Sequence, residues 1–351
     1  MREEVCTLID VIDPQPNTTI LIYDVHASES GALAILDDFY NQVQKYADKS
    51  VKWIFVVSTP EYEETENIMV LRFPWVKKNW VNRLFFDNFT TRLIIKKYNP
   101  DKVFSLQNKG IPFFSKDQFV YLHLPFILTE HRFTIEDDGV KLWLYQNVIK
   151  SGIFSSLRTV KYTIVQTQWM KEALVKKVGL SPDAIIVQKP DISSNKIGRY
   201  IDSSRNRKTF FYPATAFSYK NHITLLKALK YAKERGLDEY KLILTIKENE
   251  NKLTSVLSEY VKRNGLCVVF GGPIPRHEVL EMYTHSVLLF PSYVESFGLP
   301  LLEAKMTESF IISSDCPFSR EILDGYDKVI FFSEMDYKGM GDAILHVVGY
   351  N

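Results

Sequence analysis

The sequence has few cysteines and no apolar stretch long enough to cross a bilayer. Only three of its 351 residues are cysteines, and the wide spacing of Cys6, Cys267 and Cys316 excludes a zinc motif or a disulfide framework. No uninterrupted apolar run approaches the roughly 20 residues of a transmembrane helix. Residues 1–13 are acidic and lack the apolar core of a signal peptide. We therefore expect a protein of the reducing cytosol.

The chain also lacks a charge bias and the usual cofactor motifs. Its formal net charge of +1 gives no general affinity for nucleic acid. There is no Asp-x-Asp pair or His/Asp cluster to hold Mg²⁺ or Mn²⁺, and no G-x-G-x-x-G dinucleotide fingerprint. We therefore expect no nucleic-acid partner, no metal and no other cofactor.

Composition and patterning instead indicate two α/β domains. Apolar residues make up 46% of the chain and charged residues 24%, as in soluble globular proteins. Strand and helical patterns alternate in two series that begin near residues 18 and 209. We predict two Rossmann-like domains over residues 1–155 and 156–335, and a C-terminal helix over 336–351 that packs back toward the N-terminal domain. A polar surface connection is expected over residues 191–208.

The most informative stretch runs from Phe290 to Ala304. An apolar strand ends at Phe290, a glycine-bearing loop follows, and Pro300 suits the first turn of a helix. The free N–H groups at such a helix start bind anions such as phosphate. Two carboxylates, Glu295 and Glu303, accompany this anion site and accept hydrogen bonds from sugar hydroxyls. A nucleotide sugar combines both ligand chemistries.

This stretch resembles glycosyltransferase family four, the retaining enzymes of GT-B fold. Its hallmark is a pair of glutamates with seven residues between them, and Glu295 and Glu303 have that spacing. The surrounding Pro291-Ser292, Phe297-Gly298-Leu299-Pro300 and Glu303-Ala304 are also similar to the family. The alternative is that Glu303 only complements a helix dipole and Glu295 is a solvated loop charge.

The resemblance implies a division of roles between the domains. The N-terminal domain would bind the acceptor, and the C-terminal domain would bind a UDP- or GDP-sugar. Glu295 would hold hydroxyls of the donor sugar and Glu303 the ribose, while the leaving phosphate acts as base in a same-face attack. The remaining donor contacts would come from Ser296, Phe297, Gly298 and Leu299.

A second stretch adds a cation beside a helix start. Lys220 lies just before the helix that begins near residue 223, and this position favours a bound pyrophosphate. The family has a Lys here and an Arg five residues earlier. Lys220 matches the Lys, but Thr215 stands at the Arg position, so phosphate neutralisation is thinner or comes from elsewhere. Lys220 as an ordinary surface charge is the alternative.

Glycines and histidines provide further candidates. The turn with Gly272 and Ile274 would seat the nucleotide base by resemblance, and Arg276 either reaches a phosphate or caps the region. His123 ends a strand and is similar to the family's histidine near the donor sugar, although a structural role is the alternative. Gly31 either approaches the donor diphosphate or belongs to an ordinary turn. His26 and His222 are further candidates.

The segment Pro74–Tyr98 combines basic and aromatic residues. It carries six Lys or Arg residues against one acid, Asp87, with Trp and Phe side chains interleaved. Such a segment suits an anionic membrane surface. Alternatively, it is a helix that buries its aromatics in the core and shows its lysines to water.

These observations predict a metal-independent retaining hexosyltransferase of cell-surface polysaccharide synthesis. The acceptor would be a glycan or a polyprenyl-linked glycan, reached by an enzyme that is cytoplasmic and peripheral on the inner face of the membrane. A nucleotide-sugar epimerase of the same fold and a non-catalytic nucleotide-sugar-binding protein are the alternatives. Consumption of a sugar acceptor would separate the first from transfer, and donor hydrolysis the second.

Overall fold

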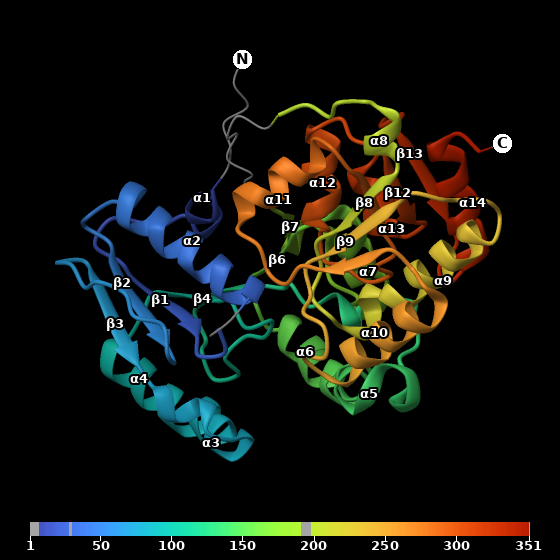
Figure 1. Ribbon diagram of the computed structural model, residues 1–351. Helices are drawn as coiled ribbons and strands as arrows, with labels where there is room; N and C mark the ends of the chain where they lie inside the picture. The colour runs from blue at the N-terminus through green and yellow to red at the C-terminus, as the bar shows by residue number, and fades with distance from the viewer. Residues whose placement is uncertain (1–6, 28–29, 191–197, 351) are drawn as a thin grey trace. The chain divides into compact units, whose positions relative to one another are not determined.

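In a computed structural model the chain forms two α/β units (Figure 1). The structure describes residues 7–27, 30–190 and 198–350, so Cys6, residues 28–29 and residues 191–197 of the polar connection lie outside it. The first unit comprises the chain up to Leu128 together with Leu144–Pro190. The second comprises Thr129–Trp143 together with the chain after Pro190.

The first unit contains a parallel sheet of seven strands among its described residues, in the order β3-β2-β1-β4-β5-β6-β7. From β1 the chain first builds one side of the sheet and then crosses back to β4, which confirms the prediction of a Rossmann-like domain. The strands are β1 (Thr19–Asp24), β2 (Lys52–Val57), β3 (Ile68–Arg72), β4 (Lys102–Ser105), β5 (Asp117–Tyr121), β6 (Tyr162–Val165) and β7 (Ile185–Val187).

The central strand of this sheet is buried on both faces, as its uninterrupted apolar sequence predicts. Successive side chains of a strand point to opposite faces. Ile20 and Ile22 pack in one core cluster with Phe39 of the following helix, whereas Leu21 and Tyr23 pack in another. Helices therefore cover both sides of the sheet.

Helical segments lie between these strands along the chain, and α5 among them falls almost entirely in the second unit. The expected segment Pro74–Tyr98 is divided into a 3₁₀ turn, two α-helices and an intervening π-helical turn, and the region 135–157 is helical although no helix was expected there. The segments are α1 (Leu8–Ile12), α2 (Ser30–Tyr46), η1 (Pro74–Lys77), α3 (Trp80–Phe85), η2 (Phe86–Thr90), α4 (Thr91–Tyr98), η3 (Pro125–Ile127), α5 (Ile135–Leu144), η4 (Tyr145–Ile149), α6 (Lys150–Leu157), α7 (Gln168–Val178) and η5 (Pro182–Ala184).

The described residues of the second unit build a parallel six-stranded sheet in the order β10-β9-β8-β11-β12-β13. Its strands are β8 (Thr209–Tyr212), β9 (Lys241–Leu244), β10 (Val268–Phe270), β11 (Val287–Phe290), β12 (Ile311–Ser314) and β13 (Val329–Phe332). Its helices after residue 198 are α8 (Ser204–Arg207), η6 (Ser218–Lys220), α9 (His222–Lys233), α10 (Lys252–Asn264), α11 (Arg276–Tyr283), α12 (Leu299–Met306), α13 (Pro317–Ile322) and α14 (Tyr337–Val348).

The boundary between the units differs from the predicted position near residue 155. Strands β6 and β7 pair with the first sheet, so the first unit continues to Pro190. The polar connection that follows Pro190, and not the helix before β6, marks the transition. Helix α14 packs on α9 and β13 in its own unit, and its expected return toward the N-terminal domain stays a prediction.

Within the described ranges, no helix combines the length and apolar character needed to cross a membrane.

Candidate functional site

The candidate site lies where the second sheet reverses its strand order. The chain runs outward from β8 through β9 to β10, and then returns to pair β11 with the other side of β8. Ligands of such sheets bind at the carboxyl ends of the strands beside this switch point. Lys220 follows β8 and Glu295 follows β11, so the topology brings both predicted residues to one sheet edge.

Hydrogen bonds join the loops that carry these two residues. The Tyr219 carbonyl accepts a bond from the Tyr293 N–H at 3.1 Å, and Ser292 Oγ lies 3.3 Å from the same oxygen. Asn221 has a positive φ, and its side-chain Nδ2 donates to the Pro291 carbonyl at 3.3 Å. The two loops therefore hold one another in register.

Lys220 and Glu295 form a direct ion pair in this frame. Lys220 Nζ donates to Glu295 Oε1, and Ser292 Oγ donates to the same oxygen at 2.7 Å. Both charged side chains retain some exposure, 17% for Lys220 and 14% for Glu295. A cation and a carboxylate thus lie together at the predicted sugar and phosphate position.

The loop then enters α12 through a glycine that no other residue can replace without strain. Gly298 is the N-cap of α12 and has a φ of 91°, a region that side chains disfavour. A Cβ there would also lie 3.4 Å from Leu301 and Phe318. Phe297 is buried and anchors the loop, while Ser296 and Leu299 are half-buried beside the helix start.

Glu303 lies on α12, buried behind the loop. Only 5% of it is exposed. Its Oε1 is 2.9 Å from Arg276 Nη2, and its Oε2 accepts a 3.3 Å bond from the buried Tyr283 hydroxyl. Burial raises the pKa of Glu303, and the Arg276 charge and the Tyr283 bond oppose that rise. The structure therefore pairs Arg276 with a predicted donor-binding carboxylate.

The predicted base-binding turn follows β10 at the same carboxyl edge. Gly272 has a φ of 72°, and its N–H donates to the Ile246 carbonyl at 3.1 Å. A Cβ on Gly272 would lie 3.2 Å from the side chain of Lys247, a cation that the sequence analysis missed. Ile274 is half-buried in the turn that leads into α11.

His123 and Gly31 belong to the first unit. His123 follows β5, where burial lowers its pKa to about 4 and keeps the ring neutral at pH 7. Its N–H donates to Asn108 Oδ1 at 2.8 Å, and its buried Nδ1 has no hydrogen-bond partner in the structure. Gly31 is the second residue of α2. Their predicted donor contacts remain predictions.

His222 is unsuited to acid–base chemistry near neutral pH. It starts α9 and is 2% exposed. Burial, reinforced by the Lys220 charge, lowers its pKa to about 3. Its ring centroid lies 4.9 Å from that of Tyr212, so it acts as a packed neutral side chain.

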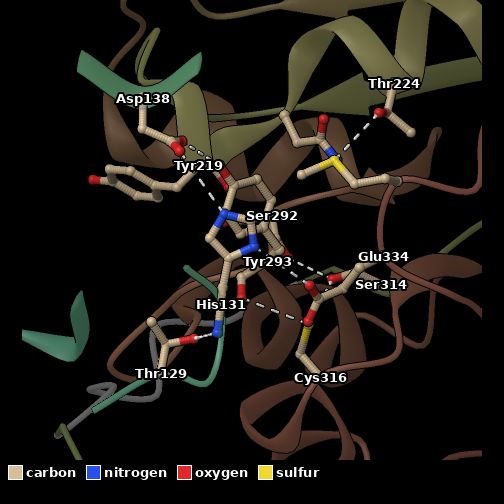
Figure 2. Close-up of polar contacts among 12 residues, drawn as sticks. Thr129, His131, Asp138, Tyr219, Thr224, Ser292, Tyr293, Ser314, Cys316 and Glu334 are labelled. Atoms are coloured by element: carbon tan, nitrogen blue, oxygen red, sulfur yellow. Dashed lines mark hydrogen bonds and ion pairs between the residues drawn. The ribbon is translucent and has the colours of Figure 1, made fainter. Parts of the chain in front are cut away.

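A polar network adjoins the loop that carries Glu295. Figure 2 shows the His131 and Tyr293 side chains next to each other within this network. Their ring centroids are 4.3 Å apart. The Tyr293 hydroxyl donates to Asp138 Oδ1 at 2.9 Å, and His131 lies 3.9 Å from both Asp138 and Glu334. Cys316 Sγ lies 3.3 Å from Glu334 Oε1. Burial raises the pKa of Cys316 and keeps it a thiol.

Sequence reasoning missed the side chains that orient the two glutamates. Ser292 contacts Glu295 and Tyr283 contacts Glu303, yet neither residue stands at a spacing that is typical of a functional motif. Only their proximity to the motif was a signal, since Ser292 lies within the stretch itself. His131 and Asp138 come from Thr129–Trp143, a part of the second unit that lies far from Tyr293 in sequence, so no local pattern connects them with Tyr293. Within the described residues, no three His, Cys, Asp or Glu side chains gather to hold a metal ion.

Three solved structures share the fold across nearly the whole chain. WaaG, a glycosyltransferase involved in lipopolysaccharide biosynthesis, has a TM-score of 0.68 at 14% identity, covering 94% of this chain and 90% of its own. The corresponding values for sucrose-phosphate synthase from Thermosynechococcus elongatus are 0.67, 14%, 94% and 89%. For HepE from Anabaena in complex with UDP-glucose they are 0.65, 14%, 95% and 90%.

Sequence comparison finds one family that is similar to the second unit. No curated protein sequence matches the chain, but the family model described as "Glycosyl transferases group 1" matches residues 196–348. The matched range contains both loops, both glutamates and the whole second sheet. Residues 196–348 are therefore similar to the group 1 glycosyl transferases, and the two Rossmann-like units have the GT-B architecture of the solved structures.

Proposed function

We propose that this protein is a glycosyltransferase that moves a hexose, with retention of configuration, from a nucleoside-diphosphate sugar to a glycan acceptor. The observation that carries the proposal is the Lys220–Glu295 ion pair at the switch point of the second sheet, beside the start of α12. Lys220 and the free N–H groups of α12 would stabilise the departing diphosphate. Glu295 would accept hydrogen bonds from the sugar being transferred.

The donor is a UDP- or GDP-sugar in this proposal. Glu303 would bind the ribose, and the Gly272 turn would seat the base with Ile274 against its face. HepE, which shares the fold, binds UDP-glucose, which supports a uridine nucleotide. His123 and Gly31 stay candidates for donor contacts in this proposal.

The reaction needs no metal in this proposal. Lys220 and the start of α12 supply positive charge, and Lys247 adds a cation at the same edge, where Thr215 replaces the family's Arg. Transfer should therefore continue in EDTA at an undiminished rate. An absolute requirement for added Mg²⁺ or Mn²⁺ would instead make Thr215 a vacancy that a metal ion fills.

The acceptor is a lipid-linked glycan at the cytosolic face of a membrane, with a role in cell-surface polysaccharide synthesis. Trp80, Phe85 and Phe89 of the Pro74–Tyr98 segment are 72%, 53% and 60% exposed. The alternative of a helix that buries its aromatics is therefore wrong for these three, although Phe86 is buried. Exposed aromatics among basic residues suit a peripheral membrane contact. WaaG acts in lipopolysaccharide biosynthesis, which supports an acceptor of this kind.

Substitution of Glu295 tests the proposal. Glu295→Gln preserves the size of the side chain and removes the charge that faces Lys220. We expect nucleoside-diphosphate affinity to stay near the wild-type value in calorimetry, because Glu295 is assigned to the sugar. Turnover, followed as release of nucleoside diphosphate from a panel of UDP- and GDP-sugars, should fall at least about tenfold, the effect of losing one charged hydrogen bond.

Glu259→Gln, an exposed acid on α10, is the matched control and should leave both measurements unchanged. Wild-type turnover of Glu295→Gln with every donor would remove Glu295 from the site. Conversion of the donor without consumption of any acceptor would identify an epimerase instead. Nucleotide binding without any turnover would identify a binding protein.

A further inference from the structure

The first sheet has a switch point of its own, and polar side chains gather there. Strand order reverses between β1 and β4, which pair through Tyr23 and Ser105. Asp24 ends β1 and His26 follows it, while Gln107 follows β4, so all three lie at one carboxyl edge. This is the place in the first unit that Lys220 and Glu295 occupy in the second, where ligands of such sheets bind.

The hydrogen bond between Arg83 and His26 fixes the tautomer of the histidine. Arg83 Nη2 contacts His26 Nδ1, and a guanidinium can only donate. Nδ1 must therefore accept, and a neutral imidazole then carries its proton on Nε2. Burial, followed by the positive charges of Arg83, Lys109 and Lys77, lowers the pKa of His26 well below its usual value and keeps it neutral. Its Nε2–H is a buried donor without an acceptor in the structure.

Near His26, the positive charge of Arg83 is not paired with a carboxylate of the described residues. Among the residues that the structure describes, no carboxylate lies within ion-pairing distance of Arg83, whose contact is the neutral His26 ring. Lys77 of η1 donates to the His26 carbonyl. Lys109 reaches the same edge from the β4 loop and pairs with Asp87 at 2.6 Å, where the Tyr23 hydroxyl also donates at 2.7 Å.

Two buried polar side chains complete this edge. Gln107 is 6% exposed, and neither its Nε2 nor its Oε1 has a hydrogen-bond partner in the structure. Its side chain reaches the Tyr23 hydroxyl only in a poorly aligned contact. Asp24 is 2% exposed and accepts backbone bonds on Oδ1, whereas its Oδ2 has no partner there. Buried polar groups ordinarily find partners, so these orphans indicate a ligand.

We propose that Arg83, His26 and Lys109, with Gln107, form a binding site for a phosphate group of the acceptor. The inference rests on the proposed glycosyl transfer and adds the acceptor's anionic group to it. Hydrogen-bond donors converge on the site from η1, α3 and the loops after β1 and β4. So many donors suit the oxygens of a phosphate better than the two oxygens of a carboxylate. Arg is the side chain best shaped to bind phosphate oxygens in pairs. The Asp24 carboxyl would accept a bond from a neighbouring acceptor hydroxyl.

Binding of two soluble probes to the full chain, without lipid present, tests this site. Farnesyl diphosphate represents a lipid-linked acceptor and glucose 6-phosphate a phosphorylated sugar. We expect Arg83→Gln to weaken farnesyl diphosphate binding about ten- to a hundredfold in calorimetry, the effect of losing a charged hydrogen bond. Arg83→Lys should recover part of that loss because it keeps the charge but not the paired donors. Arg92→Gln, which removes an exposed Arg on α4 that packs over Phe113, is the matched control and should bind normally.

The outcomes separate this site from the donor site. UDP affinity should be unaffected by Arg83→Gln and weakened by Glu303→Ala, and an equal loss of UDP affinity in Arg83→Gln would assign the cluster to the donor and overturn the proposal. Arg83-dependent binding of glucose 6-phosphate but not farnesyl diphosphate would keep the site and identify a phosphorylated sugar as the source. Absence of binding for both probes, or equal affinities in wild type and Arg83→Gln, overturns the proposal even where UDP binds and donor turnover proceeds.

Discussion

At the scale of single residues, the two glutamates of the motif differ in their surroundings. Glu295 faces a cation at a partly open edge, whereas Glu303 is buried between Arg276 and Tyr283. Two glutamates of one sequence motif therefore lie in two different chemical settings. The first setting suits the proposed contact of Glu295 with the transferred sugar, and the second suits the proposed contact of Glu303 with the ribose.

Glu303→Ala should weaken UDP or GDP binding. The charged bond that Glu303 would make to a ribose hydroxyl contributes roughly 1.5–3 kcal/mol, or about ten- to a hundredfold in Kd by calorimetry. Glu281→Ala, an exposed acid on the neighbouring α11, is the control with the same change. Unchanged affinity for both nucleotides in Glu303→Ala would remove the ribose assignment.

The buried carboxyl of Asp24 makes a prediction about pH. Burial raises its pKa from 3.8 to about 6, although backbone bonds from Ala27 and His26 and the charges of Lys77 and Arg83 oppose the rise. The folded state then binds a proton more tightly than the unfolded chain between those two pH values. Folding stability from this group is therefore greatest below pH 4 and is lost as the pH rises to about 6.

Asp24→Asn removes this titration, so the variant should gain stability over wild type as the pH rises. The raised pKa corresponds to a total gain of about 3 kcal/mol above pH 6. About half of that should appear between pH 5 and pH 7.5 in urea unfolding. Asp183→Asn, at an exposed position, should show no such trend. A constant difference between Asp24→Asn and wild type would place the folded pKa of Asp24 near its ordinary value.

At the scale of elements, the sequence predicts strands and helix starts where local physics decides them. The both-faced apolar run of β1 and the Gly-Leu-Pro entry to α12 are local signals, and both elements form as expected. The division of Pro74–Tyr98 into four short segments has no comparable signal. Neither has the bond between Tyr293 and Asp138, because the two residues are 155 positions apart. Candidate residues on the motif itself were accessible from sequence, but the side chains that orient them were not.

Tyr293→Phe should loosen the start of α5 from the Glu295 loop. The change removes the donor to Asp138, whose side chain is 4% exposed. A buried carboxylate that loses a partner costs roughly 1–3 kcal/mol, which should appear as faster amide exchange around residues 134–138 and lower unfolding stability. Tyr326→Phe, which loses a bond to the Ser309 carbonyl, is the control within the same unit. It should spare exchange at residues 134–138. Equal exchange there in Tyr293→Phe and wild type would show that other contacts hold α5.

At the scale of the whole molecule, the change to a polar composition predicts the boundary between the units better than the alternation of strands and helices does. The predicted boundary near residue 155 assigned two strands of the first sheet to the second domain. Parallel strands pair with neighbours far away in sequence. The residues of β6 therefore do not indicate which of the two sheets the strand joins. The polar connection after Pro190 is a local signal, and it coincides with the end of the first unit.

The exposed side chains of the Pro74–Tyr98 segment predict reversible binding to anionic membranes. Each Lys or Arg near such a surface contributes on the order of 1 kcal/mol, screened within a Debye length of about 8 Å at physiological salt. The protein should therefore co-sediment with vesicles containing phosphatidylglycerol, remain in solution with purely zwitterionic vesicles, and be released by high salt. Lys78→Glu with Lys96→Glu should weaken binding by at least about thirtyfold, because two attractions of that size are lost.

The double substitution at Lys78 and Lys96 leaves Lys77 unchanged, because the bond of Lys77 to His26 belongs to the proposed phosphate site. Lys227→Glu with Lys338→Glu reverses two exposed charges in the second unit and should leave vesicle binding close to wild type. Trp80→Ser with Phe89→Ser separates the aromatic contribution, since it retains every charge and should lower affinity at all salt concentrations. If the wild-type protein stays in the supernatant with anionic vesicles at low salt, the basic segment is a solvated surface and a soluble acceptor becomes the better proposal.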